Sequence, residues 1–333
     1  MLEDCKALKS VLEKHIRNCS KVFIIGHCGP DFDSFGASIG LYSIARNFYK
    51  KAFIIIDDDP AKIEPGVKRI LDAEKDNYRI ISKSEFEGLV DEKSLVIVVD
   101  TNKKDMISIG DSLDKAGDIF VIDHHTEGEK SIDTQNKHID LNSSSACEII
   151  FNLINLYNNK LDKNIAALLY AGIASDTNSF YRRVTSNTMN VASNLLKYNI
   201  DSTYIIKNVC KNITLEETKI LSNMLSNINY SSFHYIVMNR NNPLYKNVDY
   251  NVIFKKLASI IYDIEEIKLI GLFLIELDGS ISGLFRSNCN IDVDELAIML
   301  GGGGHKKASG FESNITIDEA LNISKEYIKR KIK

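Results

Sequence analysis

The sequence predicts an α/β protein: a parallel-sheet domain with helices on both faces, followed by a smaller mixed α+β domain. Short apolar, β-branched runs alternate with amphipathic stretches through the first half of the 333 residues. A helical region follows, and a second alternation of strands and helices begins near residue 233. The length also suits about two domains, because a domain commonly spans roughly 100–200 residues.

Four apolar runs in the first half are expected to be buried parallel strands. They cover residues 22–26, 52–56, 94–100 and 118–125. The amphipathic stretch 34–50 stands between the first two runs and is expected to form a helix. Strand–helix–strand alternation is typical of an open, mostly parallel sheet.

Helical periodicity dominates the middle of the chain. Apolar residues recur at three- and four-residue spacing in stretches 143–157, 162–174 and 185–199. Stretch 214–228 looks like a connecting helix, and Thr214 and Glu217 have the spacing of a capping box at its start. We therefore expect a first domain at 1–200, a helical connector at 201–230 and a second domain at 231–333.

The second alternation predicts the remaining elements in order. Strands are expected at 233–239 and 267–277, a hairpin turn and strand at 278–286, and helices at 248–264, 293–300 and 316–333. Thr316 and Glu319 again have capping-box spacing at the start of the last helix.

Composition excludes several classes of protein. Hydrophobic residues make up 44% and charged residues 26%, near the averages of globular proteins. The longest strongly apolar stretch, 269–275, is far shorter than the about 20 residues of a membrane span. The net charge of −4 argues against binding of long nucleic acid. The six cysteines form no C-x-x-C pair, so we expect reduced thiols in a cytoplasmic protein.

Acids and histidines follow several of these apolar runs. They are His27, Asp31, Asp33, Asp100, Asp123, His124, His125 and Asp176. Ligands of open α/β sheets bind at the carboxyl ends of the strands, so these residues can converge on one crevice. A single aspartate at a strand end is more often a helix cap or turn residue, and a single histidine more often a satisfied polar residue.

Clustered carboxylates repel one another unless cations are bound between them. Carboxylates with one or two imidazoles suit Mn²⁺ or Mg²⁺. Two such ions about 3.5–4 Å apart can generate hydroxide and stabilise displacement at phosphorus. The sequence therefore predicts a metal site for phosphoryl chemistry.

A glycine run near the C-terminus is the second candidate site. It comprises Gly301, Gly302, Gly303 and Gly304, and His305 follows it. Such a run can expose backbone N–H groups to an anion, although alone it would more often be a flexible turn. Arg286, followed by Ser287 on an expected strand, can bind phosphate with its guanidinium group, and the alternative is a surface arginine.

Five motifs in this order resemble the DHH phosphoesterase family and its DHH-associated C-terminal domain. They are His27-x-x-x-Asp31-x-Asp33, Val99-Asp100-Thr101, Asp123-His124-His125, Ser175-Asp176-Thr177 and the run from Gly301 to Gly310. The resemblance covers about residues 20 to 330. It implies that the first domain is the catalytic, metal-binding domain and that the second binds substrate in a cleft between the two.

The resemblance also implies a role for each residue of the motifs. One Mn²⁺ would be held by His27, Asp31 and Asp100. The other would be held by Asp33, Asp100, His124 and Asp176, with Asp100 bridging the two ions. Asp123 would orient the histidines, and His125 would lie beside the scissile phosphate as a donor or acid. Mg²⁺ is the alternative ion.

Three stretches resemble the catalytic module of cyclic di-AMP phosphodiesterases of the GdpP type. They are Gly26 to Ala37, Ser143 to Glu148, and Gly172 to Phe180 with Arg183 as a candidate substrate contact. Two features depart from that type. Membrane helices and sensor domains commonly precede its module, and none is expected here. Asn187 stands where a basic residue is usual, which puts the fine substrate preference in question.

The resemblance implies hydrolysis of cyclic di-AMP to the linear dinucleotide pApA by a hydroxide bridging two Mn²⁺ ions. The alternatives are an exonuclease on pApA or short oligoribonucleotides, and a phosphatase of adenosine bisphosphate. A non-catalytic nucleotide sensor would lack metal ligands, and the glycine run argues against an inorganic pyrophosphatase. We expect a cyclic dinucleotide or short linear oligonucleotide as partner and allow for a homodimer.

Overall fold

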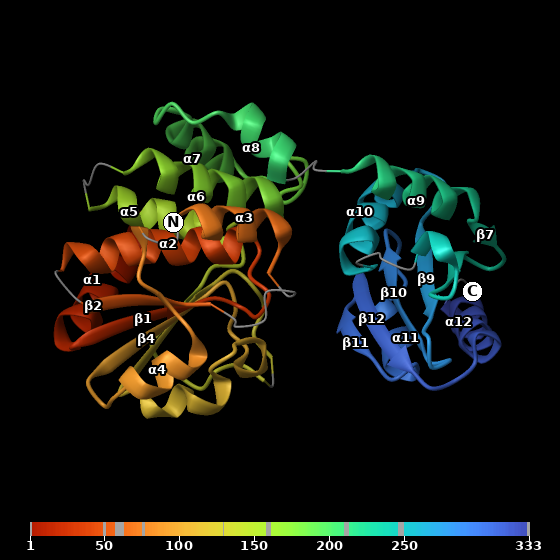
Figure 1. The fold of residues 1–333 in the computed structure, drawn as a ribbon, viewed down its shortest axis with the longest axis horizontal. Coiled ribbons are helices and arrows are strands. Elements are labelled where there is room, and N and C mark those ends of the chain that lie inside the picture. The colour runs from red at the N-terminus through yellow and green to blue at the C-terminus, as the bar shows by residue number, and fades with distance from the viewer. Residues whose placement is uncertain are drawn as a thin grey trace. The chain divides into compact units, whose positions relative to one another are not determined.

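The computed structural model describes residues 2–48, 51–56, 63–74, 77–128, 130–157, 161–209, 213–245 and 250–331. The chain divides into two compact units, Met1–Asn212 and Ile213–Lys333 (Figure 1). Helix α8 (Ser202–Val209) belongs to the first unit and helix α9 (Leu215–Ser226) to the second. The expected connector at 201–230 is thus shared between the two units.

The first unit is built on a six-stranded sheet whose order is β3-β2-β1-β4-β5-β6, and every neighbouring pair is parallel. Its strands are β1 (Lys21–Ile25), β2 (Lys51–Ile55), β3 (Ile80–Ile81), β4 (Ser94–Val99), β5 (Asp118–Asp123) and β6 (Lys137–Ile139). The expected strands are β1, β2, β4 and β5, whereas the short edge strands β3 and β6 were not predicted. The predicted fold class is confirmed.

Helices cover both faces of this sheet, most of them on one side (Figure 1). That side carries α1 (Leu2–Asn18), α2 (Phe32–Asn47), α3 (Pro65–Glu74), α5 (Ala146–Asn155), α6 (Lys163–Asp176), α7 (Ser186–Leu196) and α8. The other face is covered by α4 (Lys83–Leu89) and by the second of two 3₁₀ helices, Gly110–Lys115, which follows the first, Lys104–Met106. Helix α1 was not predicted from the sequence.

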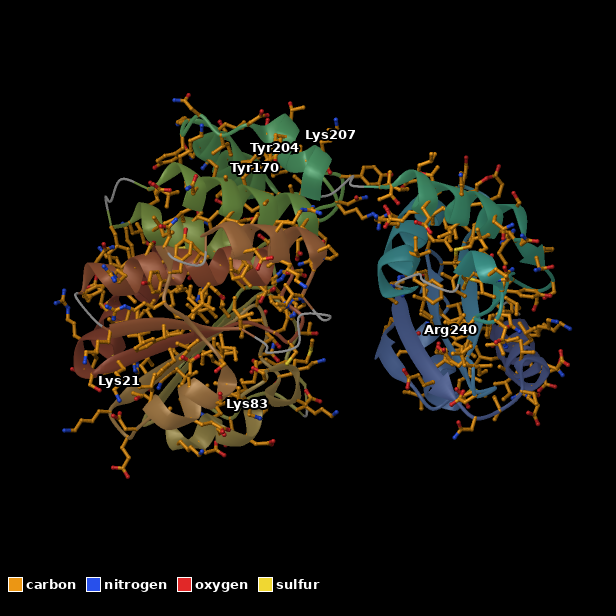
Figure 2. All side chains as sticks on the ribbon, viewed as in Figure 1. Lys21, Lys83, Tyr170, Tyr204, Lys207 and Arg240 are labelled. Atoms are coloured by element: carbon orange, nitrogen blue, oxygen red, sulfur yellow. The ribbon has the colours of Figure 1, made fainter. Side chains whose placement is uncertain are left out.

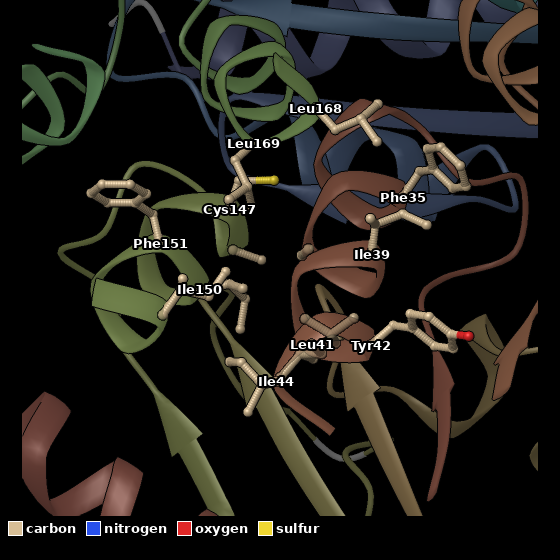
Figure 3. Packing of buried hydrophobic residues seen from close by; sticks show 14 of the residues in the cluster. Phe35, Ile39, Leu41, Tyr42, Ile44, Cys147, Ile150, Phe151, Leu168 and Leu169 are labelled. Atoms are coloured by element: carbon tan, nitrogen blue, oxygen red, sulfur yellow. The ribbon is translucent and has the colours of Figure 1, made fainter. Parts of the chain in front are cut away.

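Close packing of α2, α5 and α6 forms the centre of the first core (Figure 3). A Cβ atom on Gly36 of α2 would lie 2.9 Å from the Cys147 thiol, and one on Gly172 of α6 would lie 2.4 Å from it. The thiol of α5 therefore fills the space that these two glycines leave. This contact matters for function because Asp33 lies beside Gly172 in the same crossing.

The second unit is built on a mixed sheet of order β11-β12-β10-β9-β8-β7. Its strands are β7 (Asn229–Tyr230), β8 (His234–Asn239), β9 (Leu269–Ile275), β10 (Ile281–Ser287), β11 (Gly303–His305) and β12 (Ala308–Ser313). Strands β8 and β9 run parallel, and the other pairs are antiparallel. Helices α9 and α10 (Tyr250–Tyr262) pack in one core of this unit, and α11 (Val293–Met299) and α12 (Ile317–Lys331) in the other.

Two helix starts confirm the capping boxes that the sequence predicted. Thr214 caps α9 and exchanges hydrogen bonds with Glu217. Thr316 and Glu319 do the same at the start of α12. No helix in the described ranges is long and apolar enough to cross a bilayer.

The glycine run differs from the loop that we expected. Gly301 has a φ of 87° and begins a turn, whereas β11 starts at Gly303 and pairs with β12. A Cβ atom on Gly302 would lie 2.0 Å from the carbonyl oxygen of Gly310, so only glycine allows this approach to the neighbouring strand. The run is thus half turn and half edge strand.

Candidate metal centre

Three strands of the first sheet end at one place. The strand order changes direction between β1 and β4, and ligands of open α/β sheets bind at such a switch point. The residues that follow β1, β4 and β5, with the last residue of α6, form three groups whose candidate ligand atoms lie within 4.8 Å of one another in each group. They are the His27 cluster (His27, Asp31, Asp100), the Asp33 cluster (Asp33, His124, Asp176) and the group Asp100, Asp123, His124 and His125.

The ligand atoms of the His27 cluster suit a cation. Nδ1 of His27 lies 3.0 Å from the carbonyl oxygen of Cys28, so Nδ1 carries a hydrogen and donates it. Nε2 then faces Asp31 and Asp100, each at 3.5 Å. Burial lowers the pKa of His27, but Asp31 and the Cys28 carbonyl outweigh burial, so the pKa lies above its ordinary value.

Asp31 is both a helix cap and a candidate metal ligand, the two roles that the sequence left open. It caps α2, since Oδ1 accepts hydrogen bonds from the backbone of Asp33 and Ser34 at 3.0 and 3.1 Å. The same oxygen faces His27. The cap therefore also fixes the orientation of a candidate metal ligand.

Asp33 is held by the N-terminus of α5. Its Oδ2 accepts from the backbone N–H of Ala146 at 2.7 Å and its Oδ1 from that of Cys147 at 2.8 Å. These are orphan N–H groups of a helix start, where the helix dipole favours an anion. The carboxylate is completely buried, and Oδ2 lies 3.7 Å from Nε2 of His124.

Asp100 lies close to the histidines of both clusters. It lies 3.5 Å from Nε2 of His27 and 3.2 Å from Nε2 of His124. Burial and the neighbouring carboxylates, Asp33 first among them, raise the pKa of Asp100 well above its ordinary value. The backbone of Asp100 is left-handed, with a φ of 62°, which turns the chain at the end of β4.

His124 lies among three carboxylates, with its Nε2 3.5 Å from Asp176 in addition to Asp33 and Asp100. Burial, together with His125 and Arg183, lowers the pKa of His124. Nη2 of Arg183 donates to Nδ1 of His124 at 2.8 Å. A metal ion on Nε2 would require the proton on Nδ1, so metal binding there and this hydrogen bond are alternatives. Arg183 would then be released for another acceptor.

Asp123 organises the two histidines that follow it. Its Oδ1 accepts from the backbone N–H of His124 at 2.7 Å and from Nδ1 of His125 at 2.9 Å. Its Oδ2 accepts from Nδ2 of Asn102 at 2.8 Å. Asp123 therefore orients the ring of His125 directly and that of His124 only through the backbone. The side chain of His125 is 47% exposed, unlike the buried His124.

The arrangement fits divalent metal ions. Five carboxylates and three imidazoles meet at one sheet edge, and burial together with the neighbouring carboxylates raises the pKa of Asp100. A set of carboxylate oxygens with a few imidazoles, and no thiolate among the grouped ligands, matches Mn²⁺ or Mg²⁺ rather than structural zinc. The structure thus brings together all six residues that were predicted as ligands.

A pocket of about 910 Å³ in the second unit contains most of the residues predicted to contact substrate. Arg286 lines it with the four glycines from Gly301 to Gly304. Ala308 and Gly310 of β12 lie opposite Arg286 and Leu284 of β10, so small residues form part of this lining. Arg240, labelled in Figure 2, also lines the pocket and pairs with Glu276. The pocket combines cationic groups, backbone and apolar surface, as nucleotide sites do.

One predicted substrate residue, Ser287, is placed differently, and the side chain of another cannot be described. Ser287 is buried, and its Oγ donates to the carbonyl oxygen of Ile291 at 2.9 Å, so it stabilises the loop after β10 and does not line the pocket. Alternation along the strand explains this, since neighbouring residues point to opposite faces. The side chain of His305 lies outside the described part of the structure.

Sequence reasoning missed two supporting residues. Asn102 donates to Asp123 and to the carbonyl oxygen of His125. Glu148 is completely buried and accepts from Nδ2 of Asn187 at 2.6 Å. The position of Asn187 was noted only as a departure from the resembled type. Hydrogen bonds between polar side chains far apart in the sequence leave no pattern in the sequence, so only the fold could reveal these contacts.

Two family models match the chain. The model described as DHH family, N-terminal domain, matches residues 21–173, and the DHHA1 domain model matches residues 244–330. The first match contains His27, Asp100 and the Asp123–His125 motif, and the second contains Arg286 and the glycine run. These matches confirm the predicted resemblance.

Named relatives share most of the chain. It is 27% identical over 335 residues to the cyclic-di-AMP phosphodiesterase GdpP of Geobacillus thermodenitrificans, covering 97% of this chain and 49% of that protein. It is 29% identical over 313 residues to the probable bifunctional oligoribonuclease and PAP phosphatase NrnA of Streptococcus mutans, covering 92% and 94%. The chain thus spans about half the length of the cyclic di-AMP phosphodiesterase.

A solved structure shares the fold. An exopolyphosphatase-related protein from Bacteroides fragilis has a TM-score of 0.84 at 20% identity, covering 98% of this chain and 96% of that one. This likeness supports the two-sheet architecture.

Proposed function

Because the chain belongs to the DHH family, with a DHH N-terminal domain followed by a DHHA1 domain, we propose that it is a Mn²⁺-dependent phosphodiesterase that hydrolyses cyclic di-AMP to pApA. The observation that carries this proposal is the position of the Asp100 carboxylate. This carboxylate belongs to the His27 cluster and also lies 3.2 Å from Nε2 of His124 in the Asp33 cluster, as expected of a ligand shared by two metal ions. The similarity to GdpP over 97% of the chain supports the choice of substrate.

The bound ions would supply positive charge for the phosphate oxygens and would lower the pKa of water, so that hydroxide is present near neutral pH. The His27 cluster would hold one ion and the Asp33 cluster the other, with Asp100 between them. The fixed capping contacts of Asp31 and Asp33 hold these carboxylates in place before any ion binds. Preorganised ligands of this kind avoid reorganisation during the reaction.

Two further residues would act on the substrate. Asp123 holds Nδ1–H of His125, which leaves Nε2 of this half-exposed ring, when protonated, to donate its proton to the leaving 3′ oxygen. Arg183, once released from His124, can donate to a phosphate oxygen with its guanidinium group. Cleavage that expels the 3′ oxygen leaves a 5′-phosphate, which is the product pApA.

The pocket of the second unit would bind the nucleotide. Arg286 is largely enclosed there, with Nη1 donating to the carbonyl oxygen of Phe285 at 2.9 Å, and burial lowers its pKa without removing its charge. Its remaining N–H groups and the backbone of the glycine run offer donors to a phosphate or ribose.

A second candidate function is hydrolysis of pApA or short oligoribonucleotides, or of adenosine bisphosphate. The specific observation in its favour is the similarity to NrnA, which extends over 94% of that protein. The presence of Asn187 where a basic residue is usual does not decide between the two functions, because the side chain of Asn187 donates to buried Glu148.

Turnover of three substrates decides between these functions. Metal-stripped protein reloaded with Mn²⁺ is assayed side by side on cyclic di-AMP, pApA and adenosine bisphosphate. We expect the highest kcat/KM for cyclic di-AMP. A higher value for pApA or adenosine bisphosphate would establish the second function, and no turnover of any of the three would refute both.

A further inference from the structure

Glu148 is a buried carboxylate outside the predicted site. Its residue exposure is 0%, and its four hydrogen bonds come from neutral donors. Oε2 accepts from the backbone N–H of Ser144 at 3.2 Å, from Oγ of Ser144 at 2.5 Å and from Oγ1 of Thr188 at 2.8 Å. Oε1 accepts from Nδ2 of Asn187 at 2.6 Å. A buried acid held in this way needs a physical reason, because burial of charge is costly.

Two helix starts supply the compensation. Glu148 lies in the first turn of its own helix, α5, which Ser145 caps through the Glu148 N–H at 3.1 Å. Asn187 and Thr188 lie in the first turn of α7, which begins at Ser186. Both helix dipoles present positive ends to the carboxylate, which stabilises an anion there. The four donors add charge-assisted hydrogen bonds.

The contacts of Glu148 join the segment that holds one candidate ligand, Asp33, to the segment that follows another, Asp176. Ser144 immediately precedes the turn whose Ala146 and Cys147 N–H groups hold Asp33. Thr188, which donates to Glu148, lies at the end of the segment 176–188, and this segment begins with Asp176, the last residue of α6. Asp33 and Asp176 both belong to the Asp33 cluster, whereas the His27 cluster has no member in either segment.

We propose that Glu148 is a positioning residue for the Asp33 cluster: it ties the start of α5 to the start of α7 and thereby sets the metal affinity of that cluster and not of the His27 cluster. The inference rests on the proposed function in that it takes the two clusters as metal sites. The inference goes beyond the proposed function because it states that the metal affinity of one cluster depends on Glu148 and that of the other does not.

The substitution Glu148→Gln separates geometry from charge. Glutamine keeps the size of the side chain, and its Oε1 can accept from Ser144 and Thr188. Its NH₂ group would then face Asn187, whose amide can turn and accept through Oδ1. Glu148→Ala instead removes the acceptor and leaves buried donors without a partner.

The experiment is a calorimetric titration of metal-stripped protein with Mn²⁺, together with thermal unfolding of the metal-free protein. For Glu148→Ala we expect one site with unchanged affinity and one weakened about 10- to 100-fold, the range found when a residue that supports a ligand is removed. For Glu148→Gln we expect a loss below about threefold at that site. Glu85→Gln is the matched control, because Glu85 is an exposed first-turn glutamate of α4 and should change neither site.

A second variant keeps the test valid where Glu148→Ala does not fold. Ser144→Ala retains the carboxylate and removes its shortest hydrogen bond, so it should weaken the same single site by a smaller factor. Equal weakening of both sites, or no weakening by Glu148→Ala or Ser144→Ala, would overturn the inference. Equal losses in Glu148→Gln and Glu148→Ala would also overturn it, since charge alone would then account for the effect. If the wild-type protein binds no Mn²⁺, the proposed function itself fails, which is a distinguishable result.

Discussion

Asp100 is unfavourable for folding in two respects. It has a left-handed backbone with a φ of 62°, and its carboxylate is buried among other acids, which raises its pKa. Strain and charge repulsion of this kind persist where the surrounding structure enforces them, and they mark functional sites. Substitution of Asp100 is therefore a direct test of the candidate metal centre.

Asp100→Asn should separate stability from function. Asparagine tolerates the left-handed backbone, so the fold should survive, and loss of the charge relieves the repulsion. We expect a higher melting temperature of the metal-free protein, a smaller rise on adding Mn²⁺, and a loss of turnover by several orders of magnitude. Asp114→Asn, at an exposed acid of the second 3₁₀ helix, is the control and should change none of the three. A variant that keeps near-normal turnover would exclude Asp100 as a shared ligand.

Proton binding should oppose metal binding. The pKa of His27 is raised because Asp31 outweighs the effect of burial, and the pKa of Asp100 is raised by burial and its acidic neighbours. The stability that these raised values give the metal-free fold is present at low pH and is lost as the pH rises through the folded-state pKa. Metal ligands must release these protons. We therefore expect the Kd for Mn²⁺ to be higher at about pH 6 than at about pH 8.

Calorimetry in buffers of different ionisation enthalpy measures the released protons directly. Proton release near zero, with an affinity independent of pH across this range, would show that neither His27 nor Asp100 changes protonation on metal binding.

Individual ligands could be predicted from the sequence because each follows an apolar run in an ordered motif. His27, Asp100 and His124 are examples of these predicted ligands, and the structure brings them to one sheet edge. The positions of Asn102, Asn187 and Glu148 could not be predicted, because their hydrogen bonds join segments 21 to 39 residues apart. Nothing in local spacing specifies such partners.

The close packing of α2, α5 and α6 reaches Asp33, a residue of the candidate metal centre. A Cβ atom on Gly172 would lie 2.4 Å from the Cys147 thiol and 2.9 Å from Cα of Asp33. The elements therefore have no room for even one methyl group at this crossing, and Asp33 would have to move with the backbone.

Gly172→Ala should reduce both stability and metal affinity. Overpacking of a core costs about 1–3 kcal/mol, and the displaced Asp33 should weaken the Asp33 cluster. Thermal unfolding and Mn²⁺ titration measure the two effects. Gly172→Ala combined with Cys147→Ala should regain part of the stability, because the shortest clash is removed while the contact with Asp33 stays.

The control is Gly88→Ala in α4. A Cβ atom there would meet nothing within 4 Å, so stability should stay the same or rise. If Gly172→Ala proved as neutral as Gly88→Ala, close packing would not be what positions Asp33.

Long, strongly apolar elements could be predicted, and short ones could not. Strands β4 and β9 have nearly continuous burial and were expected from their composition. Strands β3 and β7 have two residues each, too few to show any period. Part of the glycine run forms strand β11 because it pairs with β12. This partner is set by the fold and cannot be predicted from the glycine run alone.

The two units have separate cores and separate chemistry. The first carries the acidic clusters and the second the pocket around Arg286. A dinucleotide has more groups than two metal ions can bind, so the function we propose needs both units.

Arg286→Gln should therefore affect substrates unequally. A charge-assisted hydrogen bond contributes about 1.5–3 kcal/mol, so kcat/KM for a dinucleotide should fall about 10- to 100-fold. The small ester bis-p-nitrophenyl phosphate should lose much less, and the Mn²⁺ stoichiometry should not change. The control is Lys21→Gln, at a residue paired with Asp91 on the first unit (Figure 2). Equal losses on both substrates would assign Arg286 to the reacting phosphate or to folding.

The order in which products form from cyclic di-AMP tests the central claim most directly. Metal-stripped protein is reloaded with Mn²⁺, and nucleotides are separated by chromatography over time, with EDTA-treated protein and Asp100→Asn in parallel. We expect pApA to appear first and AMP later or not at all, with no product in either parallel sample. Hydrolysis that persists in EDTA, or an intact substrate in the Mn²⁺-loaded wild-type sample, would contradict a metal-dependent phosphodiesterase at this site.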